Sequence, residues 1–196
     1  MPIPAFTIDG VLPPYVGPAG PGGAAEDLSP YVVTAIEIAT TLGHTDERRA
    51  ILRGWLRHRT ALRTLGFDRG FQWLDGSFVE QKDPRDLDVV TFLYRPPGIH
   101  SGGELAQLLR ANLNVFGRPQ VKAAYKLDFF PIDLGGSAEA LVSLSRYFLG
   151  LFSHRRGDDA WKGMLQVRLE DVADDTAAIA ALGPDPAGPA AGGVTP

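Results

Sequence analysis

Two short motifs with chemical potential lie close together near the middle of the chain. Gly76 and Ser77 end one apolar run, and Asp86 and Asp88 open the next. A glycine at a tight turn lets the backbone approach a ligand closely, and free N–H groups beside a hydroxyl can bind phosphate. Side chains alternate along a strand, so Asp86 and Asp88 face the same side. Paired carboxylates of this kind are neutralised well by Mg²⁺, which prefers oxygen ligands.

A third acidic residue follows in the segment YKLDFFPID, which offers both Asp128 and Asp133. Asp128 lies inside an apolar, strand-like run, whereas Asp133 follows Pro131, which cannot donate a ladder hydrogen bond. We therefore expect Asp128 to lie beside Asp86 and Asp88, and Asp133 to lie outside that cluster in the turn before a helix. Three carboxylates at one point would support two-metal phosphoryl chemistry.

At this point the sequence resembles the DNA polymerase β-type nucleotidyltransferase superfamily, and more narrowly its small bacterial stand-alone members, the minimal nucleotidyltransferases. The resemblance rests on WLDGSFV at 73–79, PRDLDVV at 84–90 and Asp128, and takes in LPP at 12–14 and DERRAILRGW at 46–55. It implies a polymerase β-like fold with a small mixed sheet flanked by helices, and Mg²⁺-dependent transfer of a nucleoside monophosphate from a nucleoside triphosphate such as ATP. The eight residues between Ser77 and Asp86 leave little room for the helix that usually follows the Gly-Ser turn.

On this interpretation the chain is an enzyme whose catalytic and metal-binding residues are Asp86, Asp88 and Asp128. Gly76 and Ser77 would bind phosphates, and Lys82 is either an additional phosphate ligand or simply exposed. The acceptor hydroxyl could belong to a protein side chain, an RNA 3′ end or a small molecule, and Asp128 is the candidate to help deprotonate it. The alternative is a non-catalytic module on the same fold, which binds a partner protein as in a toxin–antitoxin or defence pair.

Composition narrows the other possibilities. The 196 residues carry a formal net charge of −4, so no overall basic field attracts nucleic acid or a membrane surface. The absence of cysteine excludes disulfides, thiolate zinc sites and a cysteine nucleophile. Neither a secretory signal nor a membrane-spanning run is visible, so we expect a cytoplasmic protein without membrane partners.

The chain divides into an extended Pro/Gly-rich arm (1–25), a nucleotidyltransferase-like domain (26–182) and a flexible tail (183–196). Ile8 and Leu12 should anchor the arm to the core. Helices and strands alternate without repeats, which favours an α+β (or α/β) fold. Capping residues and periodicity predict helices at 29–42, 45–66, 101–117 and 137–152, and strands at 71–75, 87–94, 121–130 and 163–170.

Two groups of cations allow both structural and functional interpretations. Arg49, Arg53 and Arg57, with Arg59 and Arg63, suggest a solvated helix face, or less simply an acceptor-binding surface. The second group follows a helix and could stabilise its C-terminus or contact the triphosphate or the acceptor; it comprises His154, Arg155, Arg156 and Lys162.

Overall fold

The computed structural model describes residues 3–17 and 24–184. The α-helices are α1 (Ala35–Leu42), α2 (Asp46–Thr64), α3 (Gly102–Ala111), α4 (Leu113–Phe116), α5 (Arg118–Tyr125), α6 (Ala138–Phe152) and α7 (Val172–Ala181). The strands are β1 (Tyr31–Val32), β2 (Gly70–Asp75), β3 (Leu87–Leu93), β4 (Leu127–Asp133) and β5 (Leu165–Arg168). Two short 3-10 helices, η1 (Ala25–Asp27) and η2 (Gly76–Val79), complete the described elements.

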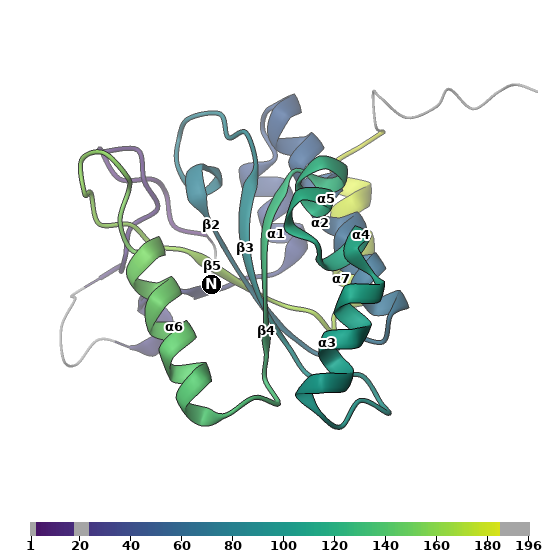
Figure 1. The fold of residues 1–196 in the computed structure, drawn as a ribbon. Helices are drawn as coiled ribbons and strands as arrows, with labels where there is room; N and C mark the ends of the chain where they lie inside the picture. Colours follow the sequence, from purple (N-terminus) through teal and green to yellow (C-terminus); the bar gives the residue numbers. More distant parts are fainter. Residues whose placement is uncertain (1–2, 18–23, 185–196) are drawn as a thin grey trace, which may run out of the picture.

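The strands form one mixed sheet in the order β1-β5-β2-β3-β4. The two outer pairs, β1 with β5 and β3 with β4, are parallel, whereas β2 runs antiparallel to both of its neighbours. α6 lies on one face of the sheet and the other α-helices cover the opposite face (Figure 1). The expected α+β class with a small mixed sheet flanked by helices is therefore confirmed.

Strand alternation divides the apolar residues between the two faces. Leu74 and Val89 belong to the larger core beneath α1, α2 and α7. Trp73, Val90 and Phe92 belong to the smaller core with Phe148 and Phe152 of α6. Among the described elements, α6 is the single helix on this face, and this leaves room for a cavity beside it.

Several helix starts agree with the capping signals in the sequence. Thr45 caps α2, Ser101 and Glu104 form the capping box of α3, and Ser137 caps α6. In each case the hydroxyl accepts a hydrogen bond from a backbone N–H of the first turn, which would otherwise be unsatisfied. The strands expected at 71–75 and 87–94 correspond to β2 and β3.

Other predicted elements were wrong. The helix expected from Ser29 begins only at Ala35, because Thr34 is the N-cap and residues 31–32 pair with β5. The strand expected at 121–130 is divided between α5 and β4, since Lys126 in the left-handed region ends the helix first. The helix α7 was not predicted; it packs against α1 and α2.

The sequence suggested that Pro131 would end strand pairing, and this prediction is wrong. It lies within β4 opposite Thr91, and β4 is the edge strand of the sheet, without a partner on its outer side among the described strands. A proline is tolerated there because the missing N–H is not needed by a neighbour. Asp133 is consequently the last residue of the strand, where Arg95 Nη2 lies 2.7 Å from its carboxylate.

The N-terminal arm is anchored by Val11 and Leu12, both of which are buried. Leu12 N–H donates to Val79 O, and Gly163 N–H donates to Leu12 O, so the arm lies between η2 and the start of β5. Ile8 is fully exposed, so its predicted anchoring role is wrong. Most of the predicted tail, residues 185–196, lies outside the described residues. Within the described part of the chain, no helix is both long and apolar enough to cross a bilayer.

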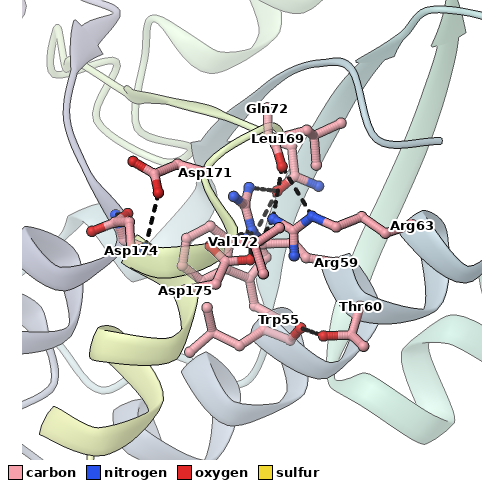
Figure 2. A network of polar contacts seen from close by, with 12 residues as sticks. Trp55, Arg59, Thr60, Arg63, Gln72, Leu169, Asp171, Val172, Asp174 and Asp175 are labelled. Atoms are coloured by element: carbon pink, nitrogen blue, oxygen red, sulfur yellow. Dashed lines mark hydrogen bonds and ion pairs between the residues drawn. The ribbon is translucent and has the colours of Figure 1, made fainter.

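Two of the arginines of α2, Arg59 and Arg63, belong to a buried polar network, whereas Arg57 is exposed and Arg49 and Arg53 are partly exposed, as expected for a solvated helix face. Arg59 is completely buried, and Figure 2 shows its guanidinium between Gln72 of β2 and Asp175 of α7. Arg59 also donates to Arg168 O of β5, and Arg63 Nη2 lies 2.6 Å from Asp175 Oδ2. Burial lowers the pKa of Arg59, and its hydrogen bond with Asp175 opposes that shift. The network joins two helices to two strands, so its role is structural.

Asp175→Asn should lower the free energy of unfolding by about 3 kcal/mol, because it leaves the buried Arg59 charge without its counter-ion. Urea unfolding monitored by circular dichroism measures this change. Asp68→Asn is the matched control, because Asp68 is exposed and should change stability by less than about 0.5 kcal/mol. Equal stabilities of the two variants would show that the ion pair contributes nothing.

Candidate functional site

Three aspartates form a row across adjacent strands at one end of the sheet. Asp75 at the end of β2 is paired in register with Asp88 of β3, which is paired with Asp128 of β4. All three lie at positions that alternate in phase with the α6-facing residues of their strands. Asp86, two residues before Asp88, shares this face. The structure therefore brings Asp128, and not Asp133, next to Asp88, as the sequence predicted.

Cations from α5 neutralise two of these carboxylates. Lys122 Nζ lies 2.6 Å from Asp86 Oδ2, and Arg118 Nη2 lies 2.6 Å from Asp128 Oδ2. The hydrogen bond from Arg118 lowers the pKa of Asp128, so Asp128 is a weaker base than the sequence alone suggested. Both cationic side chains are more than half exposed, at 59% and 53%. Exposed ion pairs of this kind contribute little free energy and can be exchanged for another cation.

Asp88 has no such partner. Within residues 3–17 and 24–184 its carboxylate forms no hydrogen bond or ion pair, although it lies between Asp75 and Asp128 in the row. Burial, followed by the charges of Asp86 and Asp128, raises the pKa of Asp88 to about 6. Its negative charge is the least compensated of the cluster, which is the condition that favours binding of a cation.

Asp75 was not identified from the sequence. It is buried, its Oδ1 has no hydrogen-bond partner among the described residues, and its Oδ2 lies 3.3 Å from Lys162 Nζ. Burial raises the pKa of Asp75 to about 7, although the charge of Lys162 opposes this shift. Its position could have identified it, because it lies at the end of an apolar run, immediately before Gly76. Burial of a carboxylate there is as unfavourable as it is at Asp88.

Gly76 makes the close approach that the sequence suggested. Its φ is +75°, and a Cβ placed there would lie 1.9 Å from Asp88 Oδ2. No other residue type could therefore occupy this position without moving Asp88. Lys162 Nζ donates to Gly76 O at 3.0 Å and so fixes the turn from the opposite side.

Ser77 lies in η2, the single short turn that replaces the longer helix, as the eight-residue spacing to Asp86 implied. The segment after it is held by Arg48, a buried residue of α2 that sequence reasoning did not identify. Arg48 donates to the backbone carbonyls of Phe78, Glu80 and Lys82. Lys82 is 61% exposed, its Nζ lies 2.8 Å from Glu80 Oε2, and it lines the cavity described next.

A cavity of about 220 Å³ joins these residues. Its lining includes Asp75, Gly76, Ser77 and Asp88, together with His154, Arg155 and Arg156 from the loop after α6. The second cation group of the sequence therefore reaches the motif residues, which lie some 80 positions earlier in the chain. Arg155 is already paired with Asp158, whereas Arg156 has no ion-pair partner within the described residues. A cavity lined by both acidic and cationic side chains is suited to a polyanionic ligand that carries a cation.

The carboxylates of the row are the ligand type that a divalent cation prefers, but they are not positioned as a set of metal ligands. Across the described part of the chain, no three acidic or histidine side chains are already grouped as metal ligands. The carboxylates of Asp86 and Asp128 are instead bound to Lys122 and Arg118. Binding of Mg²⁺ by Asp86, Asp88 and Asp128 would require both of these ion pairs to open.

The fold and the cavity define the chain as an α+β protein with an acidic row and a Gly-Ser turn at one end of a mixed sheet. Residues 4–168 match a family of unknown function, DUF6932, and the chain belongs to that family. This region includes every residue of the acidic row and the Gly-Ser turn. No curated protein and no solved structure shows significant similarity to the chain.

Gly76→Ala should be markedly more destabilising than Gly98→Ala. Both glycines have positive φ, at +75° and +86°, but a Cβ at Gly98 meets no atom within 4 Å. Gly98→Ala should therefore cost about 1 kcal/mol of unfolding free energy, from backbone strain alone. Gly76→Ala should cost about 1–3 kcal/mol more, because of the clash with Asp88. Chemical denaturation measures both, and equal losses would contradict the close approach.

The stability of the metal-free protein should depend on the ionisation of Asp88. Since its pKa is raised from 3.8 to about 6, the folded state binds more protons than the unfolded state between these values. The free energy of unfolding therefore falls as pH rises through this window. Asp88→Asn removes the penalty and should be more stable than wild type above pH 6, by on the order of 1–2 kcal/mol after allowance for partial solvation.

Urea unfolding in EDTA at several pH values across this window tests the prediction. The stability difference between Asp88→Asn and wild type should grow from about pH 4 to about pH 7 and then level off. A difference that is constant with pH would show that Asp88 is not strained by its charge.

Proposed function

We propose that this protein is a nucleotidyltransferase that transfers a nucleoside monophosphate from a nucleoside triphosphate to a hydroxyl acceptor. The observation that carries the proposal is the position of Asp88. Its carboxylate has no partner among the described residues, it lies between Asp75 and Asp128 in the row, and it touches the Gly76 turn. It also lines one cavity together with the cationic loop after α6. This arrangement has the parts that phosphoryl transfer needs, namely positioning groups and compensating charges.

The topology around the cavity supports a polymerase β-like arrangement. Asp88 lies on the strand that follows the Gly-Ser turn, antiparallel to the strand before it, and Asp128 lies on a parallel neighbour. The sequence resemblance rested on the same order of parts, namely a Gly-Ser turn, a strand with Asp86 and Asp88, and a later strand with Asp128.

The Mg²⁺ ligands would be Asp86, Asp88 and Asp128. The composition of the row and the uncompensated Asp88 charge fit a divalent cation, provided that Lys122 and Arg118 turn away into solvent. When bound, the ion would neutralise negative charge on the triphosphate. Such exchange would replace two exposed ion pairs by stronger contacts with a divalent cation.

The residues of the chain itself would position the nucleotide. The Gly76–Ser77 turn would contact the phosphates, and Arg156 and Lys82 would contribute positive charge from the rim. In the reaction the acceptor oxygen forms a bond to the α-phosphorus. The bond between that phosphorus and the oxygen that bridges the α- and β-phosphates breaks. Pyrophosphate leaves, and the hydroxyl proton passes to a carboxylate of the row or to water.

The binding-module alternative has one observation in its favour. Asp86 and Asp128 are neutralised by the protein's own cations, which is how a site without a metal would be stabilised. A binding module, however, would not need the buried charge of Asp88 or the Oδ1 of Asp75, which has no hydrogen-bond partner among the described residues. We therefore favour the enzyme.

Incubation with Mg²⁺ and α-labelled ATP, CTP, GTP and UTP should show label transfer or pyrophosphate release for wild type with at least one nucleotide. Asp88→Asn and Asp128→Asn should reduce the rate by at least about 100-fold, because each removes a proposed cation ligand. Asp133→Asn is the matched control on β4 and should retain the rate, since Asp133 lies at the other end of the strand.

A thermal shift with Mg²⁺ gives a second measurement that does not need the acceptor. Wild type should melt higher with Mg²⁺ and nucleotide than without them, and Asp88→Asn should not. Equal shifts in both proteins, or equal rates for Asp128→Asn and Asp133→Asn, would refute the proposed site.

A further inference from the structure

An apolar groove runs along the side of α6. Its volume is about 820 Å³, and its apolar lining includes Leu141, Val142 and Leu149 of α6 and, on the other wall, Trp161 and Met164. Val142 is 68% exposed and Trp161 is 59% exposed. Apolar side chains gathered and exposed in this way commonly mark a binding surface. We call this feature the α6 groove.

The α6 groove follows the helix for most of its length. Leu141, Ser145, Leu149 and Ser153 recur at four-residue intervals and all line it. The twelve residue steps from Leu141 to Ser153 correspond to about 18 Å of helix. An extended chain rises about 3.3 Å per residue, so the groove could hold about five or six residues of extended polypeptide.

One end of the groove adjoins the candidate active site. Lys162 lines both the α6 groove and the cavity of the acidic row, and its Nζ contacts Gly76 O and Asp75. Residues at the end of α6 are divided between the two hollows. Gly150 and Ser153 line the groove, whereas Leu151, Phe152 and His154 line the cavity. A ligand that lies in the groove therefore has one end next to the carboxylates.

The charges of the groove favour a polypeptide over a nucleic acid. Lys162 is 4% exposed and is paired with Asp75 and Glu80, which leaves Arg146 as the cation of the lining that has no ion-pair partner in the described residues. Binding of RNA requires several cations for its phosphates. A single arginine beside aliphatic side chains instead complements one carboxylate in an otherwise apolar segment.

We propose that the α6 groove binds the acceptor, and that the acceptor is an extended polypeptide segment with apolar side chains around a serine, threonine or tyrosine. This inference rests on the proposed function. The side-chain oxygen would bond to the α-phosphorus of the nucleoside triphosphate, pyrophosphate would leave, and the hydroxyl proton would pass to solvent or a carboxylate of the row. Arg146 lies seven residues before Ser153, about 10 Å along the helix, so an acidic residue about three positions from the hydroxyl would pair with it.

Binding can be measured without any turnover. Fluorescein-labelled peptides with a central tyrosine or serine, apolar flanks and a glutamate three positions away are titrated with wild-type protein, and fluorescence anisotropy gives the Kd. Val142→Glu should weaken binding by at least about tenfold, since it places a charge in the apolar contact. Ile179→Glu is the matched control, because Ile179 is a 48% exposed residue of α7 on the other face of the sheet, and it should leave the Kd unchanged.

A charge exchange tests the role of Arg146. Arg146→Glu should bind the glutamate peptide at least about tenfold more weakly, and a peptide with lysine at that position should recover most of the loss. A fold defect in the variant cannot produce this recovery, so the exchange distinguishes recognition from structural damage.

Three results would overturn the proposal: no saturable peptide binding, binding that Val142→Glu and Arg146→Glu leave unchanged, or preferential binding of RNA oligonucleotides. Sedimentation that shows dimers broken by Val142→Glu would also overturn it, because a second copy would then occupy the groove. Peptide binding that is lost in groove variants, together with absent label transfer, would reject the proposed reaction while retaining the peptide site. Label transfer without peptide binding would reject the peptide site alone.

Discussion

The buried guanidinium of Arg59 is the interaction on which the packing of the helical layer depends. It binds Asp175 of α7, Gln72 of β2 and the carbonyl of Arg168 in β5, and lies over the ring of Trp55. A charge that is fully removed from water is tolerated only when its hydrogen bonds are satisfied, so these elements must meet in one arrangement. The sheet is thereby held at a fixed position on α2 and α7, and its opposite face is left to α6.

Negative charge is concentrated at one end of that opposite face. Four aspartates and Glu80 lie in this region, and within the described part of the chain each except Asp88 has a cationic partner from α5, Lys82 or Lys162. Clustered carboxylates are costly in the absence of counter-ions, and the protein reduces this cost with side chains that differ in exposure. The exposed pairs of α5 can open for a ligand, whereas buried Lys162 is fixed and shapes the Gly76 turn. A cation can therefore bind at this site only if the exposed pairs open while Lys162 keeps the turn in place.

The single helix on this face also explains why two hollows lie side by side. α6 covers the centre of the sheet with Phe148 and Phe152, but its flank and its C-terminal end remain uncovered. The polar cavity forms at that end, where the strand carboxylates are, and the apolar groove forms along the flank. Lys162 lines both of them.

The sequence by itself determined the local features of this protein. Gly76, Ser77, Asp86 and Asp88 were identifiable because short-range rules of turns and strand alternation place them, and the caps of α2, α3 and α6 are equally local. Only the tertiary structure decided the pairing partners. Arg118, Lys122 and Lys162 neutralise acids distant in the chain or on another element, Arg59 is buried where helical spacing suggested solvent, and Pro131 is accommodated because β4 is an edge strand. Burial and counter-ions depend on which elements pack together, and a pattern along one segment does not contain that information.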